Sequence, residues 1–324
     1  MIPATEGRTL MNELGAKREP FVFAIDFELQ RPLIVPEKEA RAAGILFSFN
    51  GVTNGPAGNH PPRAFRFSRK PVPFETYLQA FGIVMDRIRN GDSYLVNLTF
   101  PTPVETDLTL GEICDRSNAM YSMTVQDQFA VFSPESFVRI RNGIITSYPM
   151  KGTADAALPD AREALLKNAK ELAEHNTIVD LIRNDLSIMA REVRVQRFRY
   201  VDTIRTNFKE LLQVSSEITG VLEGDYPSRI GDILFSMLPA GSVSGAPKRR
   251  TVEIIREAEG APRGYYTGVM GRFDGRDLDS GVMIRFIERT SQGLVFRSGG
   301  GITCFSDPHA EYNEMIDKVY VPFA

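Results

Sequence analysis

The sequence is poor in cysteine, with two residues among 324. Cys114 and Cys304 lie far apart and lack the spacing of metal ligands, so a disulfide framework and a zinc site are both disfavoured. The first residues lack a basic segment followed by an apolar run, and no stretch approaches the roughly 18 apolar residues that a membrane-spanning helix needs. These absences predict a protein of the reducing cytoplasm that is neither exported nor embedded in a membrane.

A strong charge of one sign is missing as well. The formal net charge is −3, the sequence pI is about 5.8, and lysine and arginine do not gather into long runs. A nucleic-acid partner is therefore not expected. The apolar composition of 43% is enough for one large core or two modest ones. A compact protein of enzyme size is the default expectation.

The spacing of apolar residues predicts a mixture of helices and strands. Apolar positions that recur every three or four residues predict helices over residues 74–89, 160–184, 227–237 and 246–259, and from residue 308 onward. Alternating positions predict a hairpin over residues 128–147 around Asn142-Gly143, and residues 1–75 are expected to form short strands. Because regular alternation of strands and helices is missing, the prediction is an α+β fold with antiparallel sheets.

Two pairs of glutamates have a spacing that suits a metal. Glu171 and Glu174 are three residues apart in one predicted helix, and Glu311 and Glu314 repeat this spacing in the last one. Carboxylates turned toward a core must be paired or bound to metal, and oxygen ligands that leave room for water and an anionic substrate favour magnesium over calcium or zinc. Either pair alone is equally compatible with a solvated helix face, and the helix dipole alone would favour Glu311.

Two glycine-containing segments could bind anions. Residues 241–248 (Gly-Ser-Val-Ser-Gly-Ala-Pro-Lys) run into a predicted helix, whose first backbone N–H groups and positive dipole end would face an anion. Residues 298–302 (Ser-Gly-Gly-Gly-Ile) could let backbone amides approach a carboxylate in the same way. Each segment alone is also compatible with an ordinary turn.

A lysine and a glutamate flank the predicted hairpin. Lys151, in the run Tyr-Pro-Met-Lys-Gly-Thr over residues 148–153, has no acidic residue closer in sequence than Asp155. It is either a surface turn lysine or a partly desolvated amine that acts as nucleophile or base. Glu135 lies near the start of the same hairpin and could serve as a general acid if its pKa is raised.

Taken together and in order, these segments resemble the chorismate-utilising enzymes, a family that includes anthranilate synthase component I, aminodeoxychorismate synthase component I, and the isochorismate and salicylate synthases. The resemblance covers roughly residues 75–324. It implies a single chorismate-utilising domain over residues 1–324, with a sandwich of antiparallel sheets, flanking helices, a shortened N-terminal strand region over 1–75 and a catalytic core over 76–324.

The resemblance also implies roles for individual residues. Glu171, Glu174, Glu311 and Glu314 would hold Mg²⁺, which bridges to a carboxylate of the substrate. Lys151 would be the nucleophile and Glu135 the general acid. Contacts to chorismate are expected from Ser244, Lys248, Tyr266, Arg285, Gly300, Gly301 and Lys318.

Lys151 bears on which member of the family the chain resembles. It stands where anthranilate synthases carry alanine and where aminodeoxychorismate synthases carry lysine, which implies amination of chorismate to 4-amino-4-deoxychorismate for folate synthesis. Leu95 stands where isochorismate and salicylate synthases carry a water-activating lysine, and a hydrophobic residue cannot activate water. It also replaces the glutamine that is usual in the amination branches. Anthranilate synthase component I and a non-catalytic chorismate-binding subunit therefore stay open as alternatives.

The source of nitrogen is expected to be a second protein. Neither cysteine lies in a glycine-flanked nucleophile turn, so a glutaminase motif is missing from the sequence. The resemblance then implies that a separate glutamine amidotransferase subunit supplies ammonia.

Overall fold

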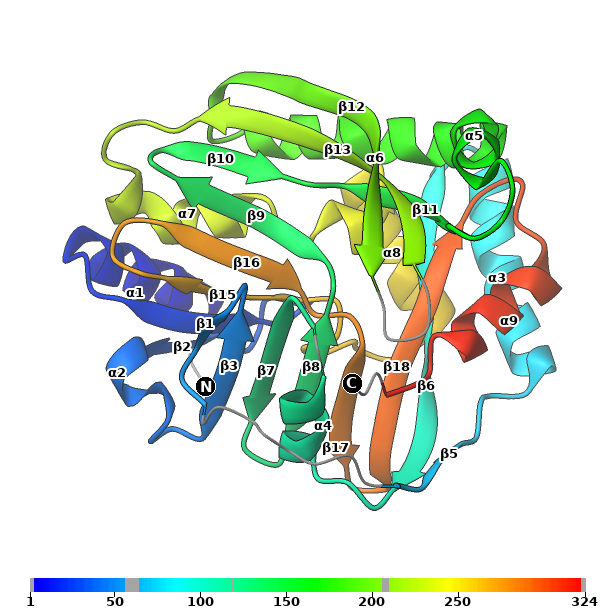
Figure 1. The fold of residues 1–324 in the computed structure, drawn as a ribbon, viewed down its shortest axis with the longest axis horizontal. Helices are drawn as coiled ribbons and strands as arrows, with labels where there is room; N and C mark the ends of the chain where they lie inside the picture. The colour runs from blue at the N-terminus through cyan, green and yellow to red at the C-terminus, as the bar shows by residue number, and fades with distance from the viewer. Residues whose placement is uncertain (1–2, 56–63, 118, 206–209, 322–324) are drawn as a thin grey trace.

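The computed structural model describes residues 3–55, 64–117, 119–205 and 210–321, and in this part of the chain the strands form two antiparallel sheets (Figure 1). The first sheet has the order β11-β13-β10-β9-β16-β15-β1-β2, with β12 paired to β13. Its strands are β1 (Phe21–Ile25), β2 (Leu33–Pro36), β9 (Ser136–Arg141), β10 (Ile144–Ser147), β11 (Met150–Asp155), β12 (Arg191–Arg205), β13 (Glu210–Val221), β15 (Val269–Phe273) and β16 (Leu278–Val282).

The second sheet has the order β14-β6-β18-β17-β8-β7-β3-β4, with β5 paired to β6. Its strands are β3 (Ile45–Phe49), β4 (Val52–Thr53), β5 (Phe67–Arg69), β6 (Leu95–Thr106), β7 (Tyr121–Val125), β8 (Phe129–Ser133), β14 (Gly245–Ala246), β17 (Phe286–Thr290) and β18 (Gly293–Ile302). The helices are α1 (Ala4–Ala16), α2 (Glu37–Ala40), α3 (Phe74–Arg89), α4 (Leu110–Arg116), α5 (Ala161–Lys167), α6 (Ala169–Ser187), α7 (Ile230–Ser236), α8 (Lys248–Glu259) and α9 (Pro308–Asp317), with short 3₁₀ turns η1 (Tyr226–Arg229) and η2 (Gly241–Val243).

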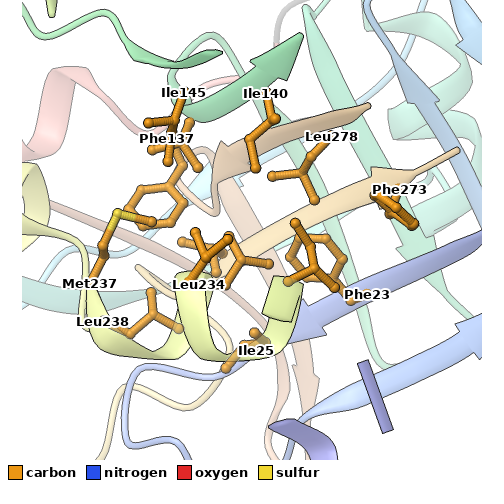
Figure 2. Close-up of a cluster of buried hydrophobic side chains, with 14 of the residues drawn as sticks. Phe23, Ile25, Phe137, Ile140, Ile145, Leu234, Met237, Leu238, Phe273 and Leu278 are labelled. Carbon is orange, nitrogen blue, oxygen red and sulfur yellow. The ribbon is translucent and has the colours of Figure 1, made fainter. Parts of the chain in front are cut away.

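The two sheets pack face to face. Strand β1 contributes side chains to two hydrophobic clusters, one on each of its faces. Phe21 and Phe23 point into a cluster that α1 and α7 cover, and Figure 2 shows Phe23, Phe273 and Leu234 of α7 in this cluster. Val22, between the two phenylalanines, points the other way into a cluster that includes side chains of β3, β7 and β8 from the second sheet. Because side chains alternate along a strand, β1 is buried on both faces. The predicted α+β sandwich is confirmed.

Several helices and turns begin or end where local sequence signals predict them to. The helix predicted over residues 74–89 is α3, and the Asn142-Gly143 turn joins β9 to β10 with positive φ angles of 52° and 78°. Helix α9 begins at Pro308, after an Asp307 side chain that accepts a hydrogen bond from the Ala310 backbone N–H at 2.9 Å.

Two sequence expectations need correction. The helix predicted over residues 160–184 is two helices, because Asn168 is extended and its side chain caps α6 by accepting from the Glu171 N–H at 3.1 Å. Residues 1–75 contain α1 as well as strands. Glycine lets α1 pack closely, since a Cβ atom at Gly15 would lie 1.8 Å from the Pro227 carbonyl oxygen. Over the described ranges, no helix is both long and apolar enough to cross a membrane.

Candidate active site

A cavity of about 440 Å³ gathers most of the residues singled out in the sequence. Lys151 reaches it from β11 of the first sheet, and Gly300 and Gly301 reach it from β18 of the second. In Figure 1, β18 runs beside α9. The other expected residues that line the cavity are Glu135, Glu171, Glu174, Tyr266, Arg285, Glu311, Glu314 and Lys318.

A bulge in β11 carries Lys151. The pairing of β11 with β13 shifts register between Lys151 and Thr153, and Gly152 between them has a φ of 77°. A Cβ atom at Gly152 would lie 3.1 Å from Glu171 Oε2, so glycine lets α6 approach this strand. The Lys151 side chain is 22% exposed, and its Nζ lies 3.8 Å from Glu174 Oε2. The amine therefore faces the cavity beside a carboxylate from α6.

Glu135 is held in the short link between β8 and β9. Its backbone N–H donates to Ser133 Oγ at 3.1 Å, and its carbonyl accepts from the Val282 N–H at 3.0 Å. Burial raises the pKa of the Glu135 carboxyl above its ordinary value. A hydrogen bond with Ser242 and the nearby cations Lys151, Lys318 and Arg285 lower this pKa only in part. A carboxyl with a raised pKa keeps its proton to higher pH, as a proton donor must.

The two glutamate pairs line the cavity from two helices. Glu171 and Glu174 come from α6, which packs on β11, β12 and β13, and Glu311 and Glu314 come from α9, which packs on β18. Glu311 is 6% exposed and accepts a hydrogen bond from Ser306 Oγ at 2.7 Å. A Cβ atom at Gly300 would lie 3.4 Å from Glu311 Oε2, so the glycine keeps the path from the cavity to α9 open.

The carboxylate oxygens of the two glutamate pairs can be compared with the ligands that Mg²⁺ requires. In the described residues, no three histidine, cysteine or acidic side chains converge into a ready-made metal site. Mg²⁺ does not require one, because it binds through one or two protein carboxylates and completes its shell with water and substrate oxygens. Four carboxylates lining one cavity supply hard oxygen donors of this kind. The residues present therefore fit Mg²⁺ in their chemistry.

Cationic side chains give the cavity the character of an anion site. Arg285, Arg297 and Lys318 line it together with Lys151. Lys318 Nζ bonds the Gly299 carbonyl at 2.8 Å and the Glu314 carboxylate at 2.6 Å. Burial raises the pKa of Tyr266 to about 12, so its hydroxyl stays neutral. These groups suit a ligand with more than one carboxylate.

Two expected residues lie elsewhere. Ser244 is fully buried, and its hydroxyl donates to the Ala240 carbonyl at 2.9 Å. Lys248 Nζ pairs with Asp185 Oδ2 at 2.6 Å and does not line the cavity. The cause is long-range pairing, because residues 245–246 form β14 on β6 and turn this part of the segment away. Ser242 and Val243 of the same segment face the cavity instead.

The sequence interpretation also missed polar residues of the cavity wall. Asn97 on β6 and Arg297 and Ser298 on β18 line the cavity. Asn97 had a signal that could have been used, since it is the one polar residue in the run Leu95-Val96-Asn97-Leu98. A polar side chain inside an otherwise apolar strand breaks the local rule and often marks a functional position.

The comparisons with known proteins agree with this geometry. Residues 32–323 match the family of chorismate binding enzymes. The chain is 49% identical over 311 residues to a protein of Haemophilus influenzae named "Uncharacterized PabA-like protein", covering 96% of this chain and 94% of that one. It is 31% identical over 265 residues to aminodeoxychorismate synthase component 1 of Bacillus subtilis, covering 77% of this chain and 55% of that protein.

The fold has a counterpart among solved structures. The menaquinone-specific isochorismate synthase of Escherichia coli superposes with a TM-score of 0.73, and the match covers 98% of this chain and 81% of that one. The sequence identity is 17%, so this likeness concerns the fold alone.

Proposed function

The chain belongs to the family of chorismate-binding enzymes, and from this premise we propose that it is an aminodeoxychorismate synthase component I. In this role it converts chorismate and ammonia to 4-amino-4-deoxychorismate for 4-aminobenzoate and folate synthesis. The observation that carries the proposal is the position of Lys151, whose amine faces the same cavity as Glu135 and the four glutamates. The lysine that activates water in isochorismate and salicylate synthases would stand at position 95, where this chain has leucine, so we assign the Lys151 amine the role of nucleophile.

The reaction proceeds by two displacements on the ring. The Lys151 amine forms a bond to ring C2, the two ring double bonds shift, and the C4 hydroxyl leaves as water with a proton from Glu135. Ammonia then forms a bond to C4, the double bonds shift back, the bond from C2 to lysine breaks, and a proton of the new ammonium group returns to Glu135. The products are 4-amino-4-deoxychorismate, water and the restored amine. The lysine thereby replaces one difficult substitution with two easier ones.

The remaining residues orient the substrate. Of the residues that line the cavity, Arg285, Lys318 and the glycine run of β18 would take up its carboxylates, and Glu171, Glu174, Glu311 and Glu314 would hold Mg²⁺. When bound, the metal neutralises carboxylate charge and fixes the position of the ring. Ammonia comes from a separate glutamine amidotransferase subunit, and the expected compartment is the cytoplasm.

The proposal is tested by identifying the product. Purified protein is incubated with chorismate, MgCl₂ and ammonium chloride, and the products are separated and analysed by mass spectrometry. We expect 4-amino-4-deoxychorismate without release of pyruvate. Pyruvate together with anthranilate would instead identify an anthranilate synthase component I. Chorismate binding without any product, even at high ammonium, would identify a non-catalytic subunit.

The raised pKa of Glu135 predicts the direction of a pH effect. A general acid is active while it holds its proton, so activity is expected at pH values below the raised pKa and is lost as pH rises through it. We expect Glu135→Gln to lower the rate by about 10² to 10⁴-fold and to abolish this alkaline limb. The measurement is kcat/KM for chorismate across pH at a constant concentration of free ammonia. A limb that persists in the variant would belong to another group.

A further inference from the structure

Asn97 carries a buried oxygen that has no partner. Its side chain lines the cavity, and its Oδ1 is buried without a hydrogen bond. Leaving such an oxygen unsatisfied is costly, and native chains rarely do so without a reason. Among the described residues, Ser298 Oγ is the other buried polar atom in this condition that lines the cavity. A serine hydroxyl can rotate and either donate or accept, whereas an amide oxygen only accepts. Asn97 Oδ1 therefore needs a donor.

The backbone of Asn97 is fixed from two sides. Its N–H donates to the Ser244 carbonyl at 2.8 Å, and its carbonyl accepts from Arg263 Nη2 at 2.7 Å. Arg263 is 1% exposed and also bonds the Val243 carbonyl at 2.8 Å and the Glu259 carboxylate at 2.6 Å. These contacts hold β6 against residues 243–244 and so fix the point on the cavity wall at which the Asn97 side chain is attached.

The residues next to Asn97 lie beside both proposed reacting groups, Lys151 and Glu135. In the pairing of β6 with β18, Asn97 lies opposite Gly301. A Cβ atom at Gly301 would lie 3.6 Å from Lys151 Nζ. On its other side, Arg263 ties Asn97 to Val243, whose neighbour Ser242 bonds Glu135. The unpartnered oxygen thus belongs to the wall that also holds the proposed nucleophile and the proposed acid.

We infer that Asn97 Oδ1 accepts a hydrogen bond from the group at ring C4, first the hydroxyl of chorismate and then the incoming ammonia. This inference rests on the proposed function. The carboxylates and the ether oxygen of chorismate only accept, so the C4 hydroxyl is the donor that the substrate offers. Ammonia, which takes its place, donates as well. Asn97 is therefore a specificity-determining residue. Its amide oxygen recognises a hydrogen-bond donor at ring C4, where the hydroxyl leaves and nitrogen is added.

The first test compares two ligands on two proteins. Chorismate and 3-[(1-carboxyvinyl)oxy]benzoate, which lacks the hydroxyl, are titrated calorimetrically into wild type and Asn97→Leu with MgCl₂ and without ammonium. We expect the variant to bind chorismate about tenfold more weakly, the upper range for one hydrogen bond, and the hydroxyl-free ligand with unchanged affinity. Equal weakening of both ligands, or no change for either, would overturn the inference. Because no turnover is needed, this result is independent of whether wild type aminates chorismate.

The second test separates function from structure and has a matched control on the same strand. Thr102 is fully buried on β6, and its Oγ1 also lacks a partner, but it does not line the cavity. Asn97→Leu and Thr102→Val each replace an unsatisfied polar group with an apolar one, so neither should lower the melting temperature of the free protein. We expect only Asn97→Leu to raise the KM for ammonia, by about tenfold. An unchanged KM for ammonia in Asn97→Leu, with wild type active, would overturn the ammonia part of the inference.

Discussion

Lys151→Ala is expected to lower formation of 4-amino-4-deoxychorismate on the order of 10³-fold or more, because it removes the atom that forms the first covalent bond. Lys151 is 22% exposed and the neighbouring Glu174 carboxylate 11%, so removing the amine takes a cation from beside a mostly buried carboxylate and should also lower the melting temperature. Rates are therefore measured well below the melting temperature of the variant. Initial rates with chorismate, MgCl₂ and ammonium chloride measure the effect.

A matched control separates the loss of this amine from the loss of any lysine. Lys167 on α5 forms an exposed ion pair with Glu163, four residues away in the same helix. Lys167→Ala should leave the rate unchanged, because this pair lies outside the cavity. Amination by Lys151→Ala at the wild-type rate would remove Lys151 from the mechanism.

The second large effect concerns the carboxylates. Glu171→Gln and Glu314→Gln, one from each pair, are each expected to raise the Mg²⁺ concentration needed for half-maximal activity by about 10 to 100-fold or more. A neutral amide keeps the size of the side chain but loses the charge that attracts the cation. Taking one residue from α6 and one from α9 tests whether both helices serve the same ion.

Thermal melting gives a second measurement that does not depend on turnover. A ligand that binds the folded chain raises its melting temperature, so MgCl₂ should stabilise wild type and stabilise the two variants less. Glu163→Gln on the surface of α5 is the control and should respond to MgCl₂ as wild type does. If Glu171→Gln and Glu314→Gln keep the full response, the metal is held elsewhere.

Much of this site could be predicted because its parts are local in sequence. A glutamate pair at i, i+3, a glycine run in a strand and a lysine after a hairpin can each be seen within a few residues. None of these signals alone separates a site from a solvated surface. The order in which they follow one another pointed to a known family, and the fold then brought eleven of the predicted residues to one cavity.

The structure departs from the sequence expectations where pairing between distant segments decides the arrangement. Ser244 and Lys248 were expected beside the substrate because their segment enters a helix. The pairing of β14 with β6 instead buries Ser244 and turns Lys248 toward Asp185. Helix α1 was missed for a similar reason. Gly15 lets this helix pack closely against Pro227, which is more than two hundred positions away in the sequence. Neither contact leaves a periodic pattern in the sequence.

The cavity is built from both halves of the sandwich. Lys151 and the α6 carboxylates come with the first sheet, whereas the glycine run and the α9 carboxylates come with the second. Neither sheet alone possesses a working set of groups, so activity requires that the two be docked in the correct register. Sequence changes in the apolar layer between the sheets, far from any reacting atom, should therefore alter turnover through a small rotation of one sheet on the other. Selection for catalysis in such a chain therefore acts on its interior as well as on its cavity.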